Sequence, residues 1–394
     1  MEEDKVHIAP WPYFAEDEIE AVQAVLESGQ VNYWTGKQCT LFEEEFASYC
    51  GVSHAIALSN ASVGLELAMR ALGIGAGDEV IVTPRSFFAS AGAIVLSGAT
   101  PIFADVDRDS QNITAESVAS VITQRTKAIL CVHLAGWPCD MEELVSLATD
   151  NGLFVIEDCA QAHGAKFNGR SVGSWGDIGV FSFCQDKIIT TGGEGGMVVS
   201  NDADLWSRIW SYKDHGKSFV AVNSPDHPKG FRWLHYGFGS NHRMTEMQAA
   251  IGRCQLRKLD GWIEARQRNA GILRAALSSF KSIRLPVVPE SVNHACYKFD
   301  VFIAPEELSK GWDRERVLER LSEYGVSPRT GSCPEIYLEE AFQSAGLAPK
   351  SRLIVAKELG ETSLQFVVHP TIGDGDMRKY SEAVAAVFAE ATPG

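Results

Sequence analysis

The chain has 394 residues, of which 45% are hydrophobic and 22% charged, and its formal net charge is −16 at pH 7. This length exceeds one typical domain and the apolar content is ample for a buried core, as in a soluble globular protein. The acidic balance argues against a nucleic-acid-binding surface, and no apolar run reaches the length of a membrane span.

The first residues, Met1 to Lys5, lack the basic flank and apolar core of a signal peptide. Nine cysteines are scattered without a Cys-x-x-Cys pair, and the histidines are not clustered at metal-ligand spacing. We therefore expect free thiols, no bound metal and a cytoplasmic location. Cys159 and Cys184 flank the site described below, and we expect both to be small buried fillers without a catalytic role.

Short β-branched runs alternate with amphipathic segments from about residue 54. This alternation predicts a mostly parallel α/β sheet with helices on both faces. The predicted strands are residues 55–58, 79–83, 101–104, 127–132 and 153–157, and the predicted helices are residues 65–71, 115–122 and 141–149. Ligand sites in such sheets lie beyond the carboxyl ends of the strands, so residues that follow a strand are the first candidates.

Two strand ends carry such candidates in the first hundred residues. Residues 59–62 (Ser-Asn-Ala-Ser) separate the first strand from its helix, and backbone N–H groups at a helix start can bind a phosphate. Ordinary N-capping by Ser62 is an equally good interpretation of this segment. Phe87 and Phe88 follow the second strand, where an aromatic pair more often belongs to the core than to a ligand site.

Asp158 and Lys187 are the most informative pair of residues. Asp158 ends an apolar strand, and Lys187 lies 29 residues later, between an apolar run and the glycine cluster at residues 192–196. Singly, each is better explained as a capping aspartate or a solvated lysine. Together they are what pyridoxal phosphate requires, namely an amine for a Schiff base and a carboxylate that keeps the pyridine nitrogen protonated. The charge-assisted hydrogen bond to that nitrogen would contribute roughly 1.5 to 3 kcal/mol.

The second half of the chain contains a long irregular segment and a smaller region. Residues 211–242 hold several glycines and prolines without a sustained period, and long loops of this kind are usually functional. The predicted elements that follow are a helix at 244–262, strands at 297–303 and 363–368, and helices at 314–323 and 376–389. We therefore predict an N-terminal arm and helix (1–30), a large cofactor-binding domain (31–262) and a small C-terminal domain (263–394).

Several motifs in the same order resemble the sugar aminotransferases of the DegT/DnrJ/EryC1/StrS family, a branch of the fold type I pyridoxal phosphate enzymes. The matching segments are residues 77–82, 101–106, 156–164, 181–196, 241–250 and 368–370, so the resemblance covers most of the chain. It implies an α/β fold with a mostly parallel central sheet flanked by helices and a smaller C-terminal α+β domain.

The resemblance also assigns cofactor-binding roles. It implies that Lys187 and Asp158 are catalytic, with Lys187 holding pyridoxal 5'-phosphate and Asp158 contacting the ring nitrogen. Ala61 and Ser62 match the positions that bind the phosphate, and the hydroxyl of Ser182 matches another phosphate ligand. These matches favour phosphate binding over capping at the first helix.

Three further residues match positions around the cofactor. Phe87 matches the aromatic that stacks on the ring, which leaves Phe88 to the core, and Gln161 matches the contact to the ring hydroxyl. Asn241 matches a residue that reaches the cofactor of the neighbouring subunit, which implies a homodimer with shared active sites. Arg243 and Glu246 are then expected to be structural partners around that contact.

The sequence departs from the family pattern at two places. Cys184 stands where the family usually has a histidine, and Gly192-Gly193 stands where a single glycine is usual. Relatives that eliminate water from the sugar carry a histidine instead of the lysine, so Lys187 disfavours that reaction. The departures leave the substrate open without affecting the lysine.

The resemblance implies an aminotransferase that converts a nucleoside-diphosphate keto sugar into an amino sugar, with glutamate as donor, for a surface polysaccharide or a glycosylated metabolite. The alternative is an aminotransferase or dehydrating enzyme of the same fold that acts on a cyclitol or an aminobenzoate precursor. Lys217, Lys229 and Arg232 are candidates for the pyrophosphate. A regulator or lipid-surface sensor without turnover would be expected to lack the lysine or to carry a fused DNA-binding segment or a basic amphipathic face. The sequence keeps Lys187 and shows neither of the other two features.

Overall fold

The computed structural model describes residues 6–226 and 230–393. Its centre is a seven-stranded sheet in the order β1-β9-β8-β5-β4-β2-β3, in which only β9 runs antiparallel to its neighbours. The strands are β1 (His54–Leu58), β2 (Glu79–Val82), β3 (Thr100–Phe103), β4 (Thr126–Val132), β5 (Phe154–Asp158), β8 (Ile178–Ser182) and β9 (Gly196–Ser200). The predicted mostly parallel α/β sheet is confirmed.

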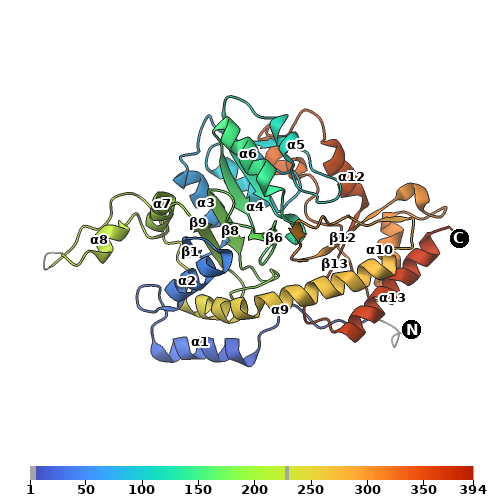
Figure 1. Ribbon diagram of the computed structural model, residues 1–394, viewed down its shortest axis with the longest axis horizontal. Coiled ribbons are helices and arrows are strands. Elements are labelled where there is room, and N and C mark those ends of the chain that lie inside the picture. The colour runs from blue at the N-terminus through green and yellow to red at the C-terminus, as the bar shows by residue number, and fades with distance from the viewer. Residues whose placement is uncertain (1–5, 227–229, 394) are drawn as a thin grey trace.

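Helices cover both faces of this sheet (Figure 1). Those before and between the strands are α1 (Glu16–Ser28), α2 (Gln38–Cys50), α3 (Ala61–Ala71), α4 (Phe88–Leu96), α5 (Ala115–Ala119), α6 (Met141–Asn151) and α7 (Ala203–Lys213). The buried face of α3 is Leu65, Ala68 and Met69, and these side chains join the core formed by the central strands. This packing fixes the N-terminal end of α3 beside the carboxyl ends of β5 and β8.

Small antiparallel sheets complete the fold. One has the order β10-β12-β13, with β10 (Ile283–Arg284), β12 (Phe299–Ile303) and β13 (Ser363–Phe366). The other has the order β11-β6-β7, with β6 (Lys166–Phe167), β7 (Arg170–Ser171) and β11 (Val292–Asn293). The C-terminal helices are α10 (Arg314–Glu323), α11 (Glu340–Ser344), α12 (Ile354–Thr362) and α13 (Asp374–Ala391). Most of the predicted elements in this region are present within a few residues.

Helix α9 (Glu246–Leu277) is much longer than the helix predicted at 244–262. Thr245 caps its start, and its carboxyl half packs into the C-terminal core through Leu273 and Leu277. The predicted end was wrong because the polar residues after 262 resemble a linker, yet Arg266 and Asn269 are buried and donate hydrogen bonds to backbone carbonyls. Helix α9 runs without a break across residue 262, where the sequence predicted a domain boundary, and the division into domains stays a prediction.

An arm, defined here as residues 217–240, projects from the sheet domain and carries α8 (Phe219–Asn223), as Figure 1 shows at the left. Backbone hydrogen bonds close its base, from Ser218 N–H to Leu234 O (2.8 Å) and from Tyr236 N–H to Gly216 O (2.9 Å). Four aromatic side chains of the described part of the arm are 77–90% exposed: Phe231, Trp233, Tyr236 and Phe238. Among the described residues, no helix is both apolar and long enough to cross a membrane.

Candidate active site

One cavity of about 610 Å³ lies at the carboxyl ends of β5 and β8. Seven of the eight predicted site residues line it: Ala61, Ser62, Phe87, Asp158, Gln161, Ser182 and Lys187. They come from four separate segments of the chain, and the sheet brings them together at one edge. This is where ligands bind in open α/β sheets.

Asp158 is the last residue of β5 and is 5% exposed. Its Oδ2 accepts a hydrogen bond from the Ser90 hydroxyl (2.7 Å), and its Oδ1 accepts one from the Ala160 N–H (3.1 Å). Burial raises the pKa of Asp158, while these two donors and the charge of Lys187 oppose the rise. A cationic partner in the cavity would therefore favour the ionised carboxylate.

The backbone of Lys187 is fixed, whereas its amine is free. Its N–H donates to Cys184 O (3.1 Å), and its carbonyl accepts a hydrogen bond from Trp11 Nε1 (2.9 Å). The Nζ atom lies 5.2 Å from the centroid of the Tyr297 ring. No residue in the described ranges forms a hydrogen bond or ion pair with this amine, so it is available to a ligand in the cavity.

The start of α3 offers unused backbone donors. Asn60 caps the helix, because its side chain accepts the Val63 N–H (2.9 Å), so the alternative of capping by Ser62 was wrong. The N–H groups of Ala61 and Ser62 have no partner within residues 6–226 and 230–393. They face the same cavity as Ser182, and helix starts of this kind bind anions.

Gly196 allows this turn to approach the sheet. A Cβ atom at Gly196 would lie 2.5 Å from the carbonyl carbon of Asn60 and 2.7 Å from the nitrogen of Ala61. Both distances are far below van der Waals contact, and the contacted atoms are backbone atoms that cannot rotate away. Gly196 thus lets the turn at the start of α3 lie against β9 in a way that no larger residue permits.

Phe87 and Gln161 line the cavity. The prediction that Phe88 belongs to the core was wrong. Phe87 is 66% exposed although it lines the cavity, so one ring face is open to a flat ligand. Phe88 is 42% exposed and packs on Phe342 (5.4 Å between centroids) rather than in the core. The Oε1 atom of Gln161 accepts the Ala135 N–H (2.8 Å), so its amide NH₂ remains as a donor.

Asn241 is the predicted site residue that lies outside this cavity. It is exposed, and its backbone forms an isolated β-bridge with Asp214. The Asp214 carboxylate binds Arg243 (2.8 Å) and Lys217 (3.0 Å). Glu246 accepts the Cys39 N–H (3.2 Å). Arg243 and Glu246 therefore each bind another part of the same chain, and their expected place around a contact of Asn241 with a neighbouring subunit stays a prediction.

Of the three cations proposed for a pyrophosphate, the two that the structure describes, Lys217 and Arg232, are engaged by other groups of the chain. Lys217 is paired with Asp214, and Arg232 donates to the backbone carbonyls of Ala221 and Val222. Lys229 lies outside the described residues. The arm cations that the structure describes stabilise the arm itself.

Sequence reasoning missed several residues that line the cavity. Ser90 holds Asp158, and Tyr297 donates a hydrogen bond from its hydroxyl to Asp186 Oδ2. Lys298 and Arg329 add two cations to the wall. Ser90 could have been found from its place one helical turn after Phe87. Tyr297, Lys298 and Arg329 lie in the C-terminal region, and only the tertiary fold brings them to the cavity wall.

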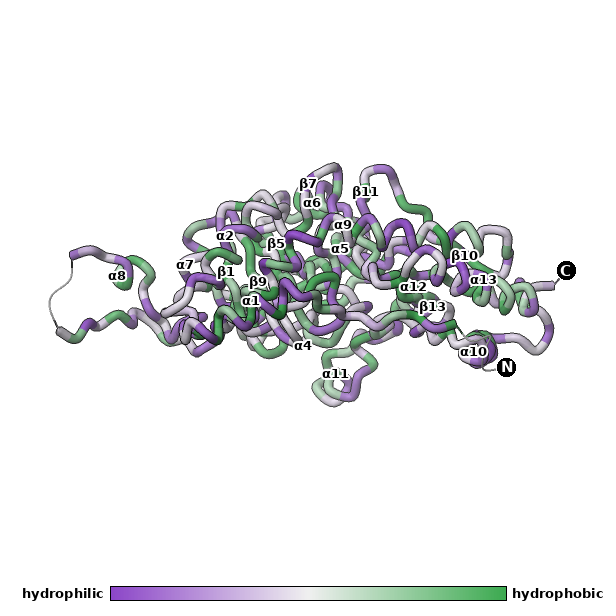
Figure 2. The backbone as a smooth tube through the Cα atoms, turned by 90° about the horizontal axis from the view of Figure 1, so that it is seen from below, coloured by the Kyte–Doolittle hydropathy of each residue, from purple (hydrophilic) through white to green (hydrophobic). Residues whose placement is uncertain are grey.

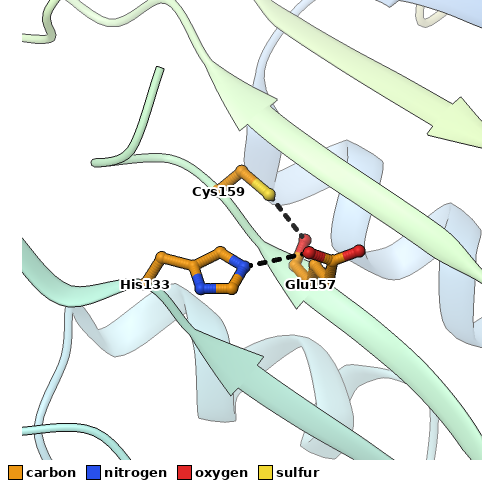
Figure 3. Close-up of side chains that lie close together, drawn as sticks. All are labelled: His133, Glu157 and Cys159. Carbon is orange, nitrogen blue, oxygen red and sulfur yellow. Dashed lines mark hydrogen bonds and ion pairs between the residues drawn. The ribbon is translucent and has the colours of Figure 1, made fainter. Parts of the chain in front are cut away.

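A second polar cluster lies behind the cavity and contains His133, Glu157 and Cys159, all fully buried (Figure 3). The Glu157 carboxylate accepts backbone N–H groups from three residues at 2.7–2.8 Å: Gly173, Trp175 and Gly176. His133 Nε2 completes the set at 3.1 Å. Because these donors occupy the carboxylate, the cluster anchors the loop after β7 to β5 and needs no ion.

Of the two departures from the family pattern, Cys184 lines the cavity, whereas Gly192 and Gly193 precede a lining residue, Glu194. Cys159 is buried as expected, but Cys184 is only half-buried and lines the wall. Gly192 and Gly193 have φ angles of 89° and 131°, which other residues rarely adopt. The second glycine therefore permits a loop conformation next to Glu194, another residue of the wall.

The donor set fits pyridoxal phosphate. It combines a free amine at Lys187, a buried carboxylate at Asp158, and unused N–H groups at Ala61 and Ser62. The Gly196 contact brings that turn close enough to share the cavity with the amine. Each feature matches one chemical group of the cofactor, namely the aldehyde, the ring nitrogen and the phosphate.

Comparison with known proteins identifies relatives over nearly the whole chain. The model of the DegT/DnrJ/EryC1/StrS aminotransferase family matches residues 12–385. A crystal structure of an aminotransferase from Psychrobacter cryohalolentis has a TM-score of 0.95 and 51% identity, covering 98% of this chain and 99% of that one. Aminotransferases of this family depend on pyridoxal phosphate.

Relatives with named substrates are also similar. GDP-perosamine synthase of Escherichia coli O157:H7 is 43% identical over 69% of this chain and 71% of its own length. UDP-N-acetyl-3-dehydro-alpha-D-glucosamine 3-aminotransferase of Acidithiobacillus ferrooxidans is 37% identical over 78% of each chain. The two names contain different nucleotides and different sugars.

Proposed function

The chain belongs to the DegT/DnrJ/EryC1/StrS aminotransferase family, and we propose that it transfers the amino group of glutamate to the keto carbon of a nucleoside-diphosphate sugar. The observation that carries this proposal is the free amine of Lys187 in one cavity with the Asp158 carboxylate and the start of α3. Relatives named for GDP- and UDP-linked sugars support the substrate class. The product is an amino sugar.

In this proposal seven cavity residues hold the cofactor. Pyridoxal phosphate, when bound, supplies a ring that accepts electrons from the substrate carbon. Asp158 keeps the ring nitrogen protonated, and Ala61 and Ser62 bind the phosphate with their N–H groups. Phe87 covers one face of the ring. Lys187, Gln161 and Ser182 bind the aldehyde carbon, the ring hydroxyl and the phosphate respectively.

Lys187 also moves the proton. Once the amine of glutamate has displaced it from the aldehyde carbon, the Lys187 Nζ would accept the proton from the α-carbon of glutamate and pass it to that aldehyde carbon. In the second half-reaction Nζ would take a proton back from there and deliver one to the sugar carbon, so it acts as general base and then acid in each half. The fixed backbone of Lys187 and the Tyr297 ring beside its amine limit where this amine can lie. The two halves follow in turn, so the route is ping-pong.

We propose that two copies of the chain share their active sites. The arm exposes four large aromatic side chains, Phe231, Trp233, Tyr236 and Phe238, and Figure 2 shows apolar stretches along it. Apolar groups gathered on a projecting segment mark an interaction surface. Asn241 lies at the base of the arm outside its own cavity, where it can reach the cavity of a partner.

The free cysteines support a compartment, and the substrate class supports a pathway. All nine cysteines are free, which supports a reducing, cytoplasmic environment. An amino sugar linked to a nucleotide is an activated building block, so we propose a role in the synthesis of a surface polysaccharide, such as a lipopolysaccharide, or of a glycosylated metabolite. The particular sugar depends on the wall around Cys184.

The test uses the absorbance of the purified protein. Bound cofactor gives a visible band, glutamate bleaches it, and a matching nucleotide keto sugar restores it. Lys187→Ala abolishes the conversion. A protein that stays colourless with added cofactor contradicts the proposal, and a band that keto sugars fail to restore, while a keto cyclitol restores it, contradicts the sugar substrate.

A further inference from the structure

Lys298 stands immediately before β12 and lines the same cavity as Lys187. Its Nζ lies 4.6 Å from the centroid of the Tyr297 ring, and the Nζ of Lys187 lies 5.2 Å from the same centroid. The cavity therefore contains two lysine amines beside one aromatic ring. The proposed function uses only one of them.

In the part of the chain that the structure describes, the Lys298 amine lies near the Tyr297 ring but forms no hydrogen bond or ion pair. The nearby acid Asp186 already accepts a hydrogen bond from the Tyr297 hydroxyl. The other buried acid of the wall, Asp158, is held by Ser90 and Ala160. A largely buried ammonium group without a partner is costly, and a ligand that brings an anionic oxygen would remove this cost.

The surrounding charges favour an anion. Burial lowers the pKa of Lys298 to about 8, and Asp186 opposes this, but the cations Arg266, Arg329 and Lys187 lower it further. Two acids, Asp186 and Asp300, therefore lie near four cations at this point, and the Asp300 carboxylate already accepts hydrogen bonds from Gln111 (3.1 Å) and Gln365 (3.0 Å). An added carboxylate would be attracted by all four and would restore the charged state of Lys298.

We propose that Lys298 binds the α-carboxylate of the amino donor and thereby selects an amino acid as donor. The inference rests on the proposed transamination. In an amino acid the carboxylate is one bond from the carbon whose proton Lys187 takes, so it must lie near the Lys187 amine. The diphosphate of a nucleotide sugar is attached several bonds from the keto carbon, so it lies farther away.

The two half-reactions then depend differently on this residue. Bleaching of the visible band by glutamate requires the carboxylate contact, whereas recovery of the band with a keto sugar does not. A charged carboxylate contact that is lost from a buried site changes affinity strongly. Lys298 is accordingly a specificity residue for the first half-reaction only.

The experiment compares Lys298→Met and Lys298→Arg with the exposed control Lys310→Met, using loaded enzyme in single-turnover absorbance measurements. Lys298→Met should raise the apparent dissociation constant for glutamate at least ~10-fold and leave the keto-sugar half within ~2-fold. Lys298→Arg should retain most of the affinity, and Lys310→Met should match the wild type. Equal band intensity and melting temperature in the variants confirm folding and cofactor loading.

Several results would overturn the inference while the proposed function stands. These are unchanged glutamate affinity in Lys298→Met, an equal loss in both halves, or a loss in the sugar half alone, which would assign the diphosphate to Lys298. A loss of glutamate affinity in Arg329→Gln but not in Lys298→Met would also overturn it. A wild-type band that neither glutamate nor any other amino acid bleaches would contradict the proposed function, and this inference with it.

Discussion

The inner end of the cavity and its rim are built differently. At the inner end, Asp158 and Gln161 are at most 7% exposed and each is held by backbone or side-chain hydrogen bonds. At the rim, Phe87 is 66% exposed and Cys184 is half-buried. The sheet fixes the part of the cavity that would hold the cofactor, while loops form the part that would meet the sugar.

The largest expected effect comes from the inner end. Asp158→Asn removes the charge that would keep the ring nitrogen protonated, so turnover should fall at least ~100-fold. The measurement is kcat for the complete reaction, with Cys184→Ser at the rim as the matched variant. If Cys184→Ser lost as much turnover as Asp158→Asn, the inner end could not be assigned to the chemistry and the rim to substrate selectivity.

A substitution in the arm tests whether a second copy of the chain completes the rim of the cavity. Trp233→Asp places a charge on a side chain that is 81% exposed, and it should convert a dimer into monomers and lower activity at least ~10-fold. Light scattering after gel filtration gives the mass. The exposed control Val287→Asp, outside the arm, should remain a dimer. A wild-type protein that is monomeric and active would contradict shared sites.

Gly196→Ala tests the turn at the start of α3. The new Cβ would meet the Asn60 backbone at 2.5 Å, so the turn must move and cofactor affinity should fall ~10-fold or more. Gly261→Ala is the control, because a Cβ there meets nothing within 4 Å and lies inside α9. That change should stabilise the protein by up to ~1 kcal/mol. Cofactor titration and thermal unfolding measure both effects.

The pH dependence of the glutamate half-reaction tests Lys298. The ammonium is charged below its pKa of about 8 and neutral above it, so kcat/KM for glutamate should decline as the pH rises through that value. Lys298→Arg stays charged, so its decline should begin at a higher pH. Identical profiles for the two proteins would show that another group controls this limb.

The smallest effect is expected at Ser90. Ser90→Ala removes one donor to Asp158 Oδ2, so the pKa of Asp158 should rise further and cofactor affinity should fall a few-fold. Ser97→Ala is the control, because Ser97 donates only to the carbonyl of Ile94. Fluorescence titration of the apoenzyme measures both. A larger loss in Ser97→Ala would contradict the role of Ser90.

The sequence predicted the inner end better than the rim. The strand periodicity placed Asp158 at a strand end, and the spacing to Lys187 pointed to the cofactor. The residues that complete the wall, such as Tyr297 and Lys298, are more than a hundred residues away along the chain. They reach the cavity only through packing of the C-terminal region, which no local pattern reports.

The sequence-based predictions were wrong at the end of α9, at Phe88 and at the cap of α3, for different reasons. The end of α9 was misplaced because a buried arginine, Arg266, and a buried asparagine, Asn269, look like linker residues until their tertiary partners are known. Phe88 was assigned to the core because an apolar residue next to a strand usually is. Asn60 was overlooked as a cap beside Ser62, although both residue types cap helices.

The lysine that holds the cofactor can be identified chemically. Borohydride reduction of the coloured protein fixes the cofactor to its lysine, and mass spectrometry of the digested protein locates it. The cavity contains two candidate amines, at Lys187 and Lys298. We predict the added mass on the peptide that contains Lys187, with Lys298 unmodified. Added mass on Lys298, or an unmodified Lys187 peptide, would contradict the account.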